Sequence, residues 1–243
     1  MKANAHDIPQ TDAIYKAASV LNSVVRLTAL EFNARLSQKY DANILLKRED
    51  LQIVRSYKIR GAFNKVSTLE KRQLNKGVVC ASAGNHAQGV AFSCNKLGVH
   101  ATIFMPVPTP KQKLEQVRFF GGAFVEVRLI GDTFDDAKDA ALDFSKVNGA
   151  VFVPPFDDPK IIEGQGTVGL EILQQALNPI DYLFLPVGGG GLSAGVSTVF
   201  KQLSPETKII GIEPMGAPAM AESLKNGSPI TLTNINKFVD GAA

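Results

Sequence analysis

The hydrophobic positions of this chain follow two alternating spacings from about residue 44 onward. Short apolar runs rich in β-branched and aromatic residues predict strands. Between them, apolar residues recur every three or four positions, which is the period of an amphipathic helix. This alternation predicts an α/β protein with a parallel sheet. The predicted strands are Ile44–Lys47, Val78–Ala81, Ala101–Met105, Phe124–Arg128, Val151–Val153, Tyr182–Pro186 and Lys208–Ile212.

Two segments illustrate the pattern. Asp132 and Thr133 are residue types that cap helix N-termini, and apolar positions at the helical period follow them. The strand Lys208–Ile212 contains an almost unbroken apolar run, which is typical of a parallel strand buried on both faces. We therefore expect both faces of this strand to be covered.

The loop Val153–Pro159 is the best candidate for a domain boundary, because its three prolines interrupt regular structure. We expect a small lobe of residues 51–150 and a large lobe built from residues 1–50 and 151–243. The stretch to about Tyr40 has helical spacing without strand signals, so we expect it to lie outside a sheet. The last residues, Val239–Ala243, show no helix or strand pattern, and we expect the large lobe to be incomplete there.

Composition and charge narrow the class of protein. A chain of 243 residues with 45% hydrophobic and 20% charged residues is too apolar to be disordered. Its 26 Lys and Arg against 23 Asp and Glu give a net charge of +3, which does not indicate a nucleic-acid partner. We find neither a signal-peptide pattern nor an apolar run of about 20 residues, the length that spans a bilayer. The only cysteines, Cys80 and Cys94, suit a reducing cytoplasm, so we expect a cytoplasmic protein without a membrane partner.

The tetraglycine run Gly188–Gly191 is the strongest local feature. It follows an apolar strand and opens a predicted helix, so its backbone N–H groups can close around an anion at the positive end of that helix. No lysine follows, which excludes a nucleotide P-loop. The segment Gly189–Ala194 also fits a dinucleotide fingerprint, with Glu213 as the ribose-binding acid. A cofactor phosphate, a dinucleotide and a purely structural turn all remain open for this segment.

Two further segments combine a strand end with candidate chemistry. Lys58 is predicted at a helix start, where the helix dipole disfavours its charge and depresses its pKa, as a nucleophilic amine requires. The alternative is an ordinary solvated lysine. Ser82–His86 follows the strand Val78–Ala81 and opens another helix, which suits it to a carboxylate. Within it, Asn85 is alternatively only an N-cap, and His86 only a packed imidazole.

These segments occur in an order that resembles a known enzyme class. Ser56–Ala62 reads S-Y-K-I-R-G-A, Ser82–Gly89 reads S-A-G-N-H-A-Q-G, and Gly188–Leu192 reads G-G-G-G-L. Together they resemble pyridoxal-phosphate (PLP) enzymes of the tryptophan-synthase-β structural class (fold type II), and among these the threonine dehydratases (threonine ammonia-lyases). The resemblance extends from about residue 11 to the last residue and includes Lys47–Asp50, Glu163–Thr167 and Gly211–Pro214.

The resemblance implies two lobes with PLP in the cleft between them. It implies that Lys58 is the Schiff-base lysine and general base, and that Asn85 bonds the phenolic oxygen of the cofactor. The phosphate would lie on the amides of Gly188, Gly189, Gly190, Gly191 and Leu192. The substrate carboxylate would lie on Ser82, Ala83, Gly84, Asn85 and His86. The implied reaction is β-elimination from L-threonine to 2-oxobutanoate and ammonia, the first step of isoleucine biosynthesis.

Departures from the class refine this interpretation. Serine racemases carry a second serine at the position of Ala83, so alanine there favours elimination over racemisation. Relatives bind a divalent cation through the glutamate corresponding to Glu213 and an aspartate six residues later, where this chain has Ala219, and we predict no metal site. L-Serine dehydratase and serine racemase remain the near alternatives, and an NAD(P)-binding oxidoreductase the distant one.

Family members continue beyond the point at which this chain ends. The resemblance therefore implies a C-terminally truncated catalytic domain that lacks the residue beside the pyridine nitrogen and the isoleucine-sensing regulatory domain. It also implies a homo-oligomer in the full-length form.

Overall fold

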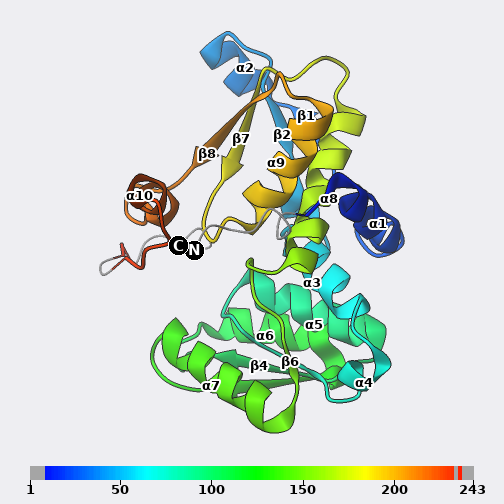
Figure 1. The fold of residues 1–243 in the computed structure, drawn as a ribbon, viewed down its shortest axis with the longest axis vertical. Coiled ribbons are helices and arrows are strands. Elements are labelled where there is room, and N and C mark those ends of the chain that lie inside the picture. Colours follow the sequence, from blue (N-terminus) through cyan, green and yellow to red (C-terminus); the bar gives the residue numbers. More distant parts are fainter. Residues whose placement is uncertain (1–8, 233–234, 237–243) are drawn as a thin grey trace.

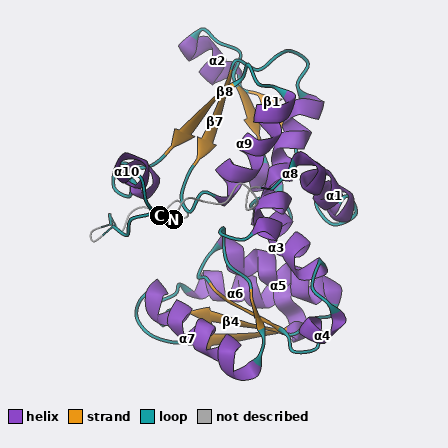
Figure 2. Ribbon diagram, viewed as in Figure 1, coloured by secondary structure: helices purple, strands orange, loops and turns teal. Residues whose placement is uncertain are grey.

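The computed structural model describes residues 9–232 and 235–236, so the predicted interruption at Val239–Ala243 lies outside the described residues. Figures 1 and 2 show two groups of strands, with helix α3 (Lys58–Ser67) between them and helix α8 (Pro159–Gln175) running alongside one group. The α/β class predicted from the alternating spacings is confirmed.

The first group of strands is a four-stranded sheet in the order β5-β4-β3-β6, and all its neighbouring strands are parallel. Its strands are β3 (Val78–Ala81), β4 (Ala101–Met105), β5 (Val125–Leu129) and β6 (Val151–Phe152). Helices α4 (Lys71–Leu74), α5 (Asn85–Leu97), α6 (Lys111–Gly121) and α7 (Phe134–Asn148) accompany it, with a 3₁₀ turn at Gly122–Phe124.

Alternation along β3 builds two cores on the two faces of this sheet. Val78 and Cys80 pack in one core with residues of α5 and α6, whereas Val79 and Ala81 pack in another with residues of α7. The predicted cap of α7 is confirmed, because the Thr133 hydroxyl accepts a hydrogen bond from the Asp136 amide in a capping box.

The second group consists of an antiparallel pair, β1 (Leu30–Phe32) with β2 (Leu45–Lys47), and a parallel pair, β7 (Tyr182–Pro186) with β8 (Lys208–Ile212). Helices α8 and α9 (Gly191–Leu203) pack their apolar faces against β7. The remaining elements are α1 (Thr11–Leu21), α2 (Ala34–Tyr40), a 3₁₀ turn at Glu49–Leu51 and α10 (Ala219–Asn226).

Two sequence-based expectations are corrected by these elements. The N-terminal stretch was expected to be helical throughout, but it contains β1, whose three residues are too few to show a period and are held by pairing with β2. Strand β8 was expected to be buried on both faces. It is parallel, as predicted, but Ile210 and Ile212 are 37% and 50% exposed. The apolar run indicates what the strand prefers to contact and does not show that a second layer is present.

The division into lobes of residues 51–150 and 1–50 plus 151–243 stays a prediction. Strand β6 pairs with β3, so residues 151–152 belong to the four-stranded sheet. Among the described residues, no helix has both the length and the apolar character needed to cross a bilayer.

Candidate functional site

Lys58 is the first residue of α3, as the sequence predicted, and its side chain is half-buried. The Ser56 hydroxyl accepts a hydrogen bond from the Lys58 amide at 3.1 Å. At the other end of the residue, the Lys58 amine donates to the carbonyl of Pro155 at 2.8 Å and lies 5.5 Å from the centre of the Tyr57 ring.

Burial lowers the pKa of the Lys58 amine to about 8. The direction agrees with the sequence-based argument, but the cause is loss of solvent around the charged form rather than the helix dipole. At pH 7 on the order of one amine in ten is then unprotonated, compared with fewer than one in a thousand for an exposed lysine. Lys58 is therefore suited to nucleophilic attack and proton abstraction near neutral pH.

The Ser82–His86 loop joins the carboxyl end of β3 to α5, and Asn85 is the first residue of that helix. Gly84 occupies the N-cap position, so Asn85 is not the N-cap. The exposed Asn85 amide makes no hydrogen bond with any described residue, which leaves it available to a ligand. The Ser82 oxygen accepts from the Gly84 amide at 3.2 Å, so its own hydroxyl hydrogen is free to donate.

The His86 side chain has a structural task. It is buried, and its Nε2 lies 2.9 Å from the Val153 carbonyl. Burial, together with the charge of nearby Lys58, lowers the pKa of His86 to about 3. The ring is consequently neutral at pH 7, and because a carbonyl can only accept, Nε2 carries the hydrogen.

The tetraglycine run forms the turn between β7 and α9, as predicted. Gly190 has φ +85°, a left-handed conformation that favours glycine. A Cβ at Gly189 would lie 2.2 Å from the Phe156 ring, and one at Gly191 would lie 2.9 Å from the Phe156 carbonyl oxygen. Within the part of the chain that the structure describes, no protein acceptor takes the amide hydrogens of Gly188 to Leu192. These amides and the α9 N-terminus suit a phosphate.

The loop of residues 153–156 connects the three predicted segments. The Val153 carbonyl meets His86, the Pro155 carbonyl meets Lys58, and Phe156 lies against the tetraglycine turn. The sequence identified this loop only as a boundary, because backbone carbonyls leave no side-chain signature. Its prolines, which withhold donors and restrict the backbone, were the only available signal.

Glu213 has a different role from either one considered in the sequence. Its two carboxylate oxygens accept hydrogen bonds from the amides of Met220 and Ala221 at 2.8 and 2.7 Å, in the first turn of α10. This explains the residue without a ribose or a metal. No cluster of three or more His, Cys, Asp or Glu side chains arranged for a metal ion was found among the described residues.

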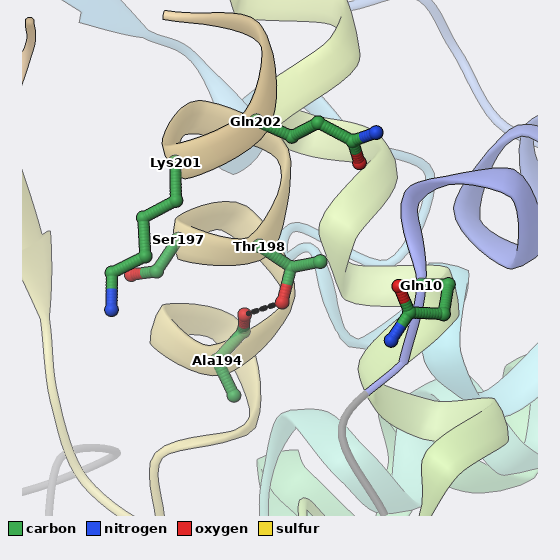
Figure 3. Close-up of a pocket in the computed structure, with 6 residues that line it drawn as sticks. All are labelled: Gln10, Ala194, Ser197, Thr198, Lys201 and Gln202. Carbon is green, nitrogen blue, oxygen red and sulfur yellow. Dashed lines mark hydrogen bonds between the residues drawn. The ribbon is translucent and has the colours of Figure 1, made fainter. Parts of the chain in front are cut away.

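A separate cavity of about 480 Å³ lies beside α9. Figure 3 shows Thr198 and Lys201 on α9 and Gln10 across from them, with the Thr198 hydroxyl bonded to the Ala194 carbonyl at 2.9 Å. None of the residues predicted to bind PLP or the substrate carboxylate lines this cavity, so it is distinct from the candidate site.

A half-buried lysine with a lowered pKa, and a glycine turn whose amides have no protein acceptor among the described residues, are together typical of α/β enzymes that attach a phosphate-bearing cofactor to a lysine. Comparison with known proteins identifies the family: the one described as "Pyridoxal-phosphate dependent enzyme" matches residues 21–243, and the chain belongs to it. The cofactor of this family is PLP, and the dinucleotide alternative is not supported.

Two curated relatives carry the same name. The chain is 56% identical to L-threonine dehydratase biosynthetic IlvA of Halalkalibacterium halodurans and 52% identical to that of Bacillus subtilis, over 96% of this chain in each case. It spans 56% of the length of each of these curated relatives.

Solved structures agree with the sequence relatives. The processed form of threonine deaminase isoform 2 from Solanum lycopersicum is 44% identical, with a TM-score of 0.89 over 100% of this chain and 69% of that one. Maize serine racemase is 32% identical, with the same TM-score of 0.89 over 94% of this chain and 68% of that one. The chain is therefore similar to both dehydratases and a racemase.

Proposed function

We propose that this protein is a PLP-dependent L-threonine dehydratase that converts L-threonine to 2-oxobutanoate and ammonia. One observation supports this most strongly: the 153–156 loop contacts Lys58, His86 at the end of the Ser82–His86 loop, and the tetraglycine turn. A nucleophilic amine and two anion-binding helix N-termini are thereby held on one scaffold. A substrate with a carboxylate and a cofactor with a phosphate need such an arrangement.

The donor set fits PLP. In the proposal, the amides of Gly188 to Leu192 hold the phosphate and Asn85 bonds the phenolic oxygen, since both lack protein partners among the described residues. Lys58 attaches the cofactor through its amine, whose lowered pKa of about 8 favours the reactive free base.

The substrate carboxylate is assigned to the Ser82–His86 loop. The Ser82 hydroxyl has a hydrogen to donate because its oxygen already accepts from Gly84. The backbone amides of Ala83 and Asn85 lie at the N-terminal end of α5, where the helix dipole favours a negative charge. The His86 side chain is already bonded to Val153, so only its backbone amide is assigned to the carboxylate.

Bound PLP supplies an electron sink that stabilises the carbanion left at the substrate Cα. Lys58, whose amine would hold the cofactor, would take the substrate Cα proton as a general base. The β-hydroxyl group leaves with a proton as water, and hydrolysis by another water yields 2-oxobutanoate and ammonia. The chain thus positions the Cα–H bond by holding the two anionic groups, and Lys58 moves the proton.

A racemase or serine dehydratase is the second candidate, since the fold is shared with maize serine racemase. Ala83 argues against racemisation because its methyl side chain has no proton to deliver to the opposite face of the substrate. One β-methyl group is worth about 1–3 kcal/mol in a pocket, so serine is expected to be a poorer substrate rather than an excluded one.

Turnover of L-threonine and L-serine, followed through the 2-oxo acid products, tests this function. We expect 2-oxobutanoate from threonine at the higher kcat/KM, no D-serine, and no turnover in Lys58→Ala. A Lys138→Ala variant, which alters an exposed residue of α7, serves as the matched control. Racemisation without elimination, or full turnover by Lys58→Ala, would exclude the proposal.

The biological setting is part of the same proposal. Production of 2-oxobutanoate and the word "biosynthetic" in the relatives' names support a place in isoleucine synthesis. Both cysteines are free and buried, which supports a reducing, cytoplasmic location. We also propose a homo-oligomeric full-length form, which light scattering of the purified protein would test.

A further inference from the structure

Four charged residues that the proposed function does not use form one buried network: Lys47, Glu49, Arg60 and Glu171. Lys47 and Glu49 come from the K-R-E-D segment and Arg60 from the lysine segment, and Thr167, which also contacts Arg60, ends the Glu163–Thr167 segment on α8. Glu171, one helical turn after Thr167, completes the network. The Arg60 side chain is 1% exposed and is among the largest fully buried side chains in the described residues.

Arg60 uses both edges of its guanidinium group. It donates to the two Glu49 oxygens at 2.9 and 2.8 Å, to the two Glu171 oxygens at 2.7 and 2.9 Å, and to the Thr167 hydroxyl at 3.1 Å. Burial opposes its charge, but the bonds to Glu49 and Glu171 outweigh it and raise the pKa of Arg60 above its ordinary value. Arg60 therefore stays charged and geometrically fixed.

The positive charge of Lys47 balances the charge of the Glu171 carboxylate. Its amine donates to Glu171 at 2.6 Å, to Gln175 at 2.9 Å and to the Thr28 carbonyl at 2.7 Å. The Thr28 hydroxyl donates in turn to Glu49 at 2.5 Å. Two cations face two carboxylates, so the cluster is formally neutral, and its members belong to β2, the 3₁₀ turn at Glu49–Leu51, α3 and α8.

The position of Arg60 on α3 links this network to Lys58. Arg60 is two residues after Lys58, which on a helix is a rotation of about 200°, so the two side chains leave opposite sides of the same turn. Lys58 faces the Pro155 carbonyl, and Arg60 binds the other side of the turn to α8. On α8 the contacts Gly164, Thr167 and Glu171 follow helical spacing along one face.

Close backbone packing reinforces the same turn. A Cβ at Gly164 of α8 would lie 2.5 Å from the Arg60 carbonyl oxygen, and a Cβ at Gly89 of α5 would lie 3.1 Å from the Lys58 carbonyl. The first turn of α3 is thus held between two helices, while the charge network fixes its rotation.

We propose that the buried network of Lys47, Glu49, Arg60 and Glu171 is a positioning device that sets the rotation of the first turn of α3 and so holds the Lys58 amine toward the 153–156 loop. The inference rests on the proposed function only for the role of Lys58 as the cofactor-binding amine. A displacement of about 1 Å at a reacting group is enough to cost on the order of 100-fold in rate.

The test compares variants of the network with a matched ion pair at the other end of α3. Arg60→Lys keeps the charge but loses the paired donors, and Glu171→Gln keeps the shape but loses a charge. Lys65→Met is the control, since Lys65 joins the last turns of α3 to Asp158, the N-cap of α8, at 2.6 Å. Two readouts are taken: competitive acetylation of Lys58 against pH in the cofactor-free protein, and the rate at which borohydride fixes PLP to Lys58.

We expect the parent and Lys65→Met to acetylate Lys58 with a midpoint near pH 8. In Arg60→Lys and Glu171→Gln the midpoint should rise by about one unit as water reaches the amine, and PLP fixation should slow about tenfold or more. If Arg60→Lys does not fold, Glu171→Gln and Thr167→Val provide the test. Thr167→Val removes one acceptor of Arg60, so it should shift both readouts in the same direction as Glu171→Gln but by a smaller amount.

Parental midpoints and fixation rates in the folded network variants would overturn the inference, as would an equal change in Lys65→Met. Acetylation needs no cofactor, so the two proposals can fail separately. If the parent protein binds no PLP while the network variants still shift the Lys58 midpoint, the proposed function fails and the positioning device stands.

Discussion

Lys58 and His86 contact the same short loop but differ in what they can do. The Lys58 amine bonds to a carbonyl that accepts its hydrogen, and burial keeps its pKa near 8, within reach of neutral pH. His86 is buried more completely and its pKa is about 3, so it stays neutral and acts as a fixed donor to Val153. The candidate site thus has one amine that titrates near neutral pH and one neutral imidazole that contacts the loop.

The burial of His86 predicts a specific sensitivity to acid. In the unfolded chain His86 takes up a proton below its ordinary pKa of 6.5, whereas in the folded chain it does so only near pH 3. The free energy of unfolding therefore falls as the pH decreases through this window. From pH 6.5 to 4.5 this loss is about 2–3 kcal/mol. Urea denaturation at the two pH values measures it. His86→Gln keeps a donor for Val153 but cannot titrate, and should lose correspondingly less; an identical loss in both proteins would contradict the assignment.

At the residue scale the sequence identified candidate side chains for chemistry but not the groups that contact and position them. Lys58, Asn85 and the glycines follow strand ends or open helices, so their local context is readable. Pro155 acts through a backbone carbonyl, and Arg60 binds Glu171 from 111 residues away. Neither relation is visible in a local pattern.

Helices α3, α5 and α8 pack together where the two groups of strands meet. Glycines on these helices determine how closely the helices approach one another. Gly61 and Gly164 lie at the point where α3 meets α8, where a Cβ on Gly61 would reach within 2.8 Å of the Ile161 carbonyl oxygen. Because backbone atoms on both sides cannot move aside, the helices approach more closely than larger residues would allow.

Gly164→Ala should therefore destabilise the protein although alanine favours helices. The added Cβ would lie 2.5 Å from the Arg60 carbonyl oxygen, and we expect a loss of about 1–3 kcal/mol in the free energy of unfolding. Gly84→Ala is the control for stability, because a Cβ there meets nothing within 4 Å. Equal denaturation midpoints for the two variants would show that the helices are not in close contact.

At the element scale, strand and helix types were predictable wherever the period was long enough. β3, β4, β7 and β8 lie at their predicted residues, since several apolar positions define each. β1 escaped prediction because pairing with β2, rather than its own three residues, makes it a strand.

For the whole molecule, the β7–β8 pair presents an apolar face. Tyr182 and Phe184 are 51% and 63% exposed, with their rings stacked at 6.4 Å between centroids, and Ile212 on β8 is half exposed. Figure 2 shows these two strands beside α9. Exposed apolar surface of this kind binds hydrophobic dyes and other apolar surfaces.

A dye-binding measurement checks this face. The 243-residue chain should enhance the fluorescence of anilinonaphthalene sulfonate while folded, and the double variant Tyr182→Ser and Phe184→Ser should reduce the signal at least twofold. Phe119→Ser, which changes a 77% exposed phenylalanine on α6, is the control and should leave most of the signal in place. An undiminished signal in the double variant would show that this face is not the one that binds the dye.

The most direct test of the whole account is covalent trapping of PLP on one lysine. Incubation with PLP, reduction with borohydride and peptide mass mapping should place the pyridoxyl group on the peptide that contains Lys58. A visible absorbance band of the bound cofactor should disappear in Lys58→Ala. Trapping that scatters over exposed lysines, or a band that survives in Lys58→Ala, would contradict the central claim that Lys58 is the cofactor-binding amine.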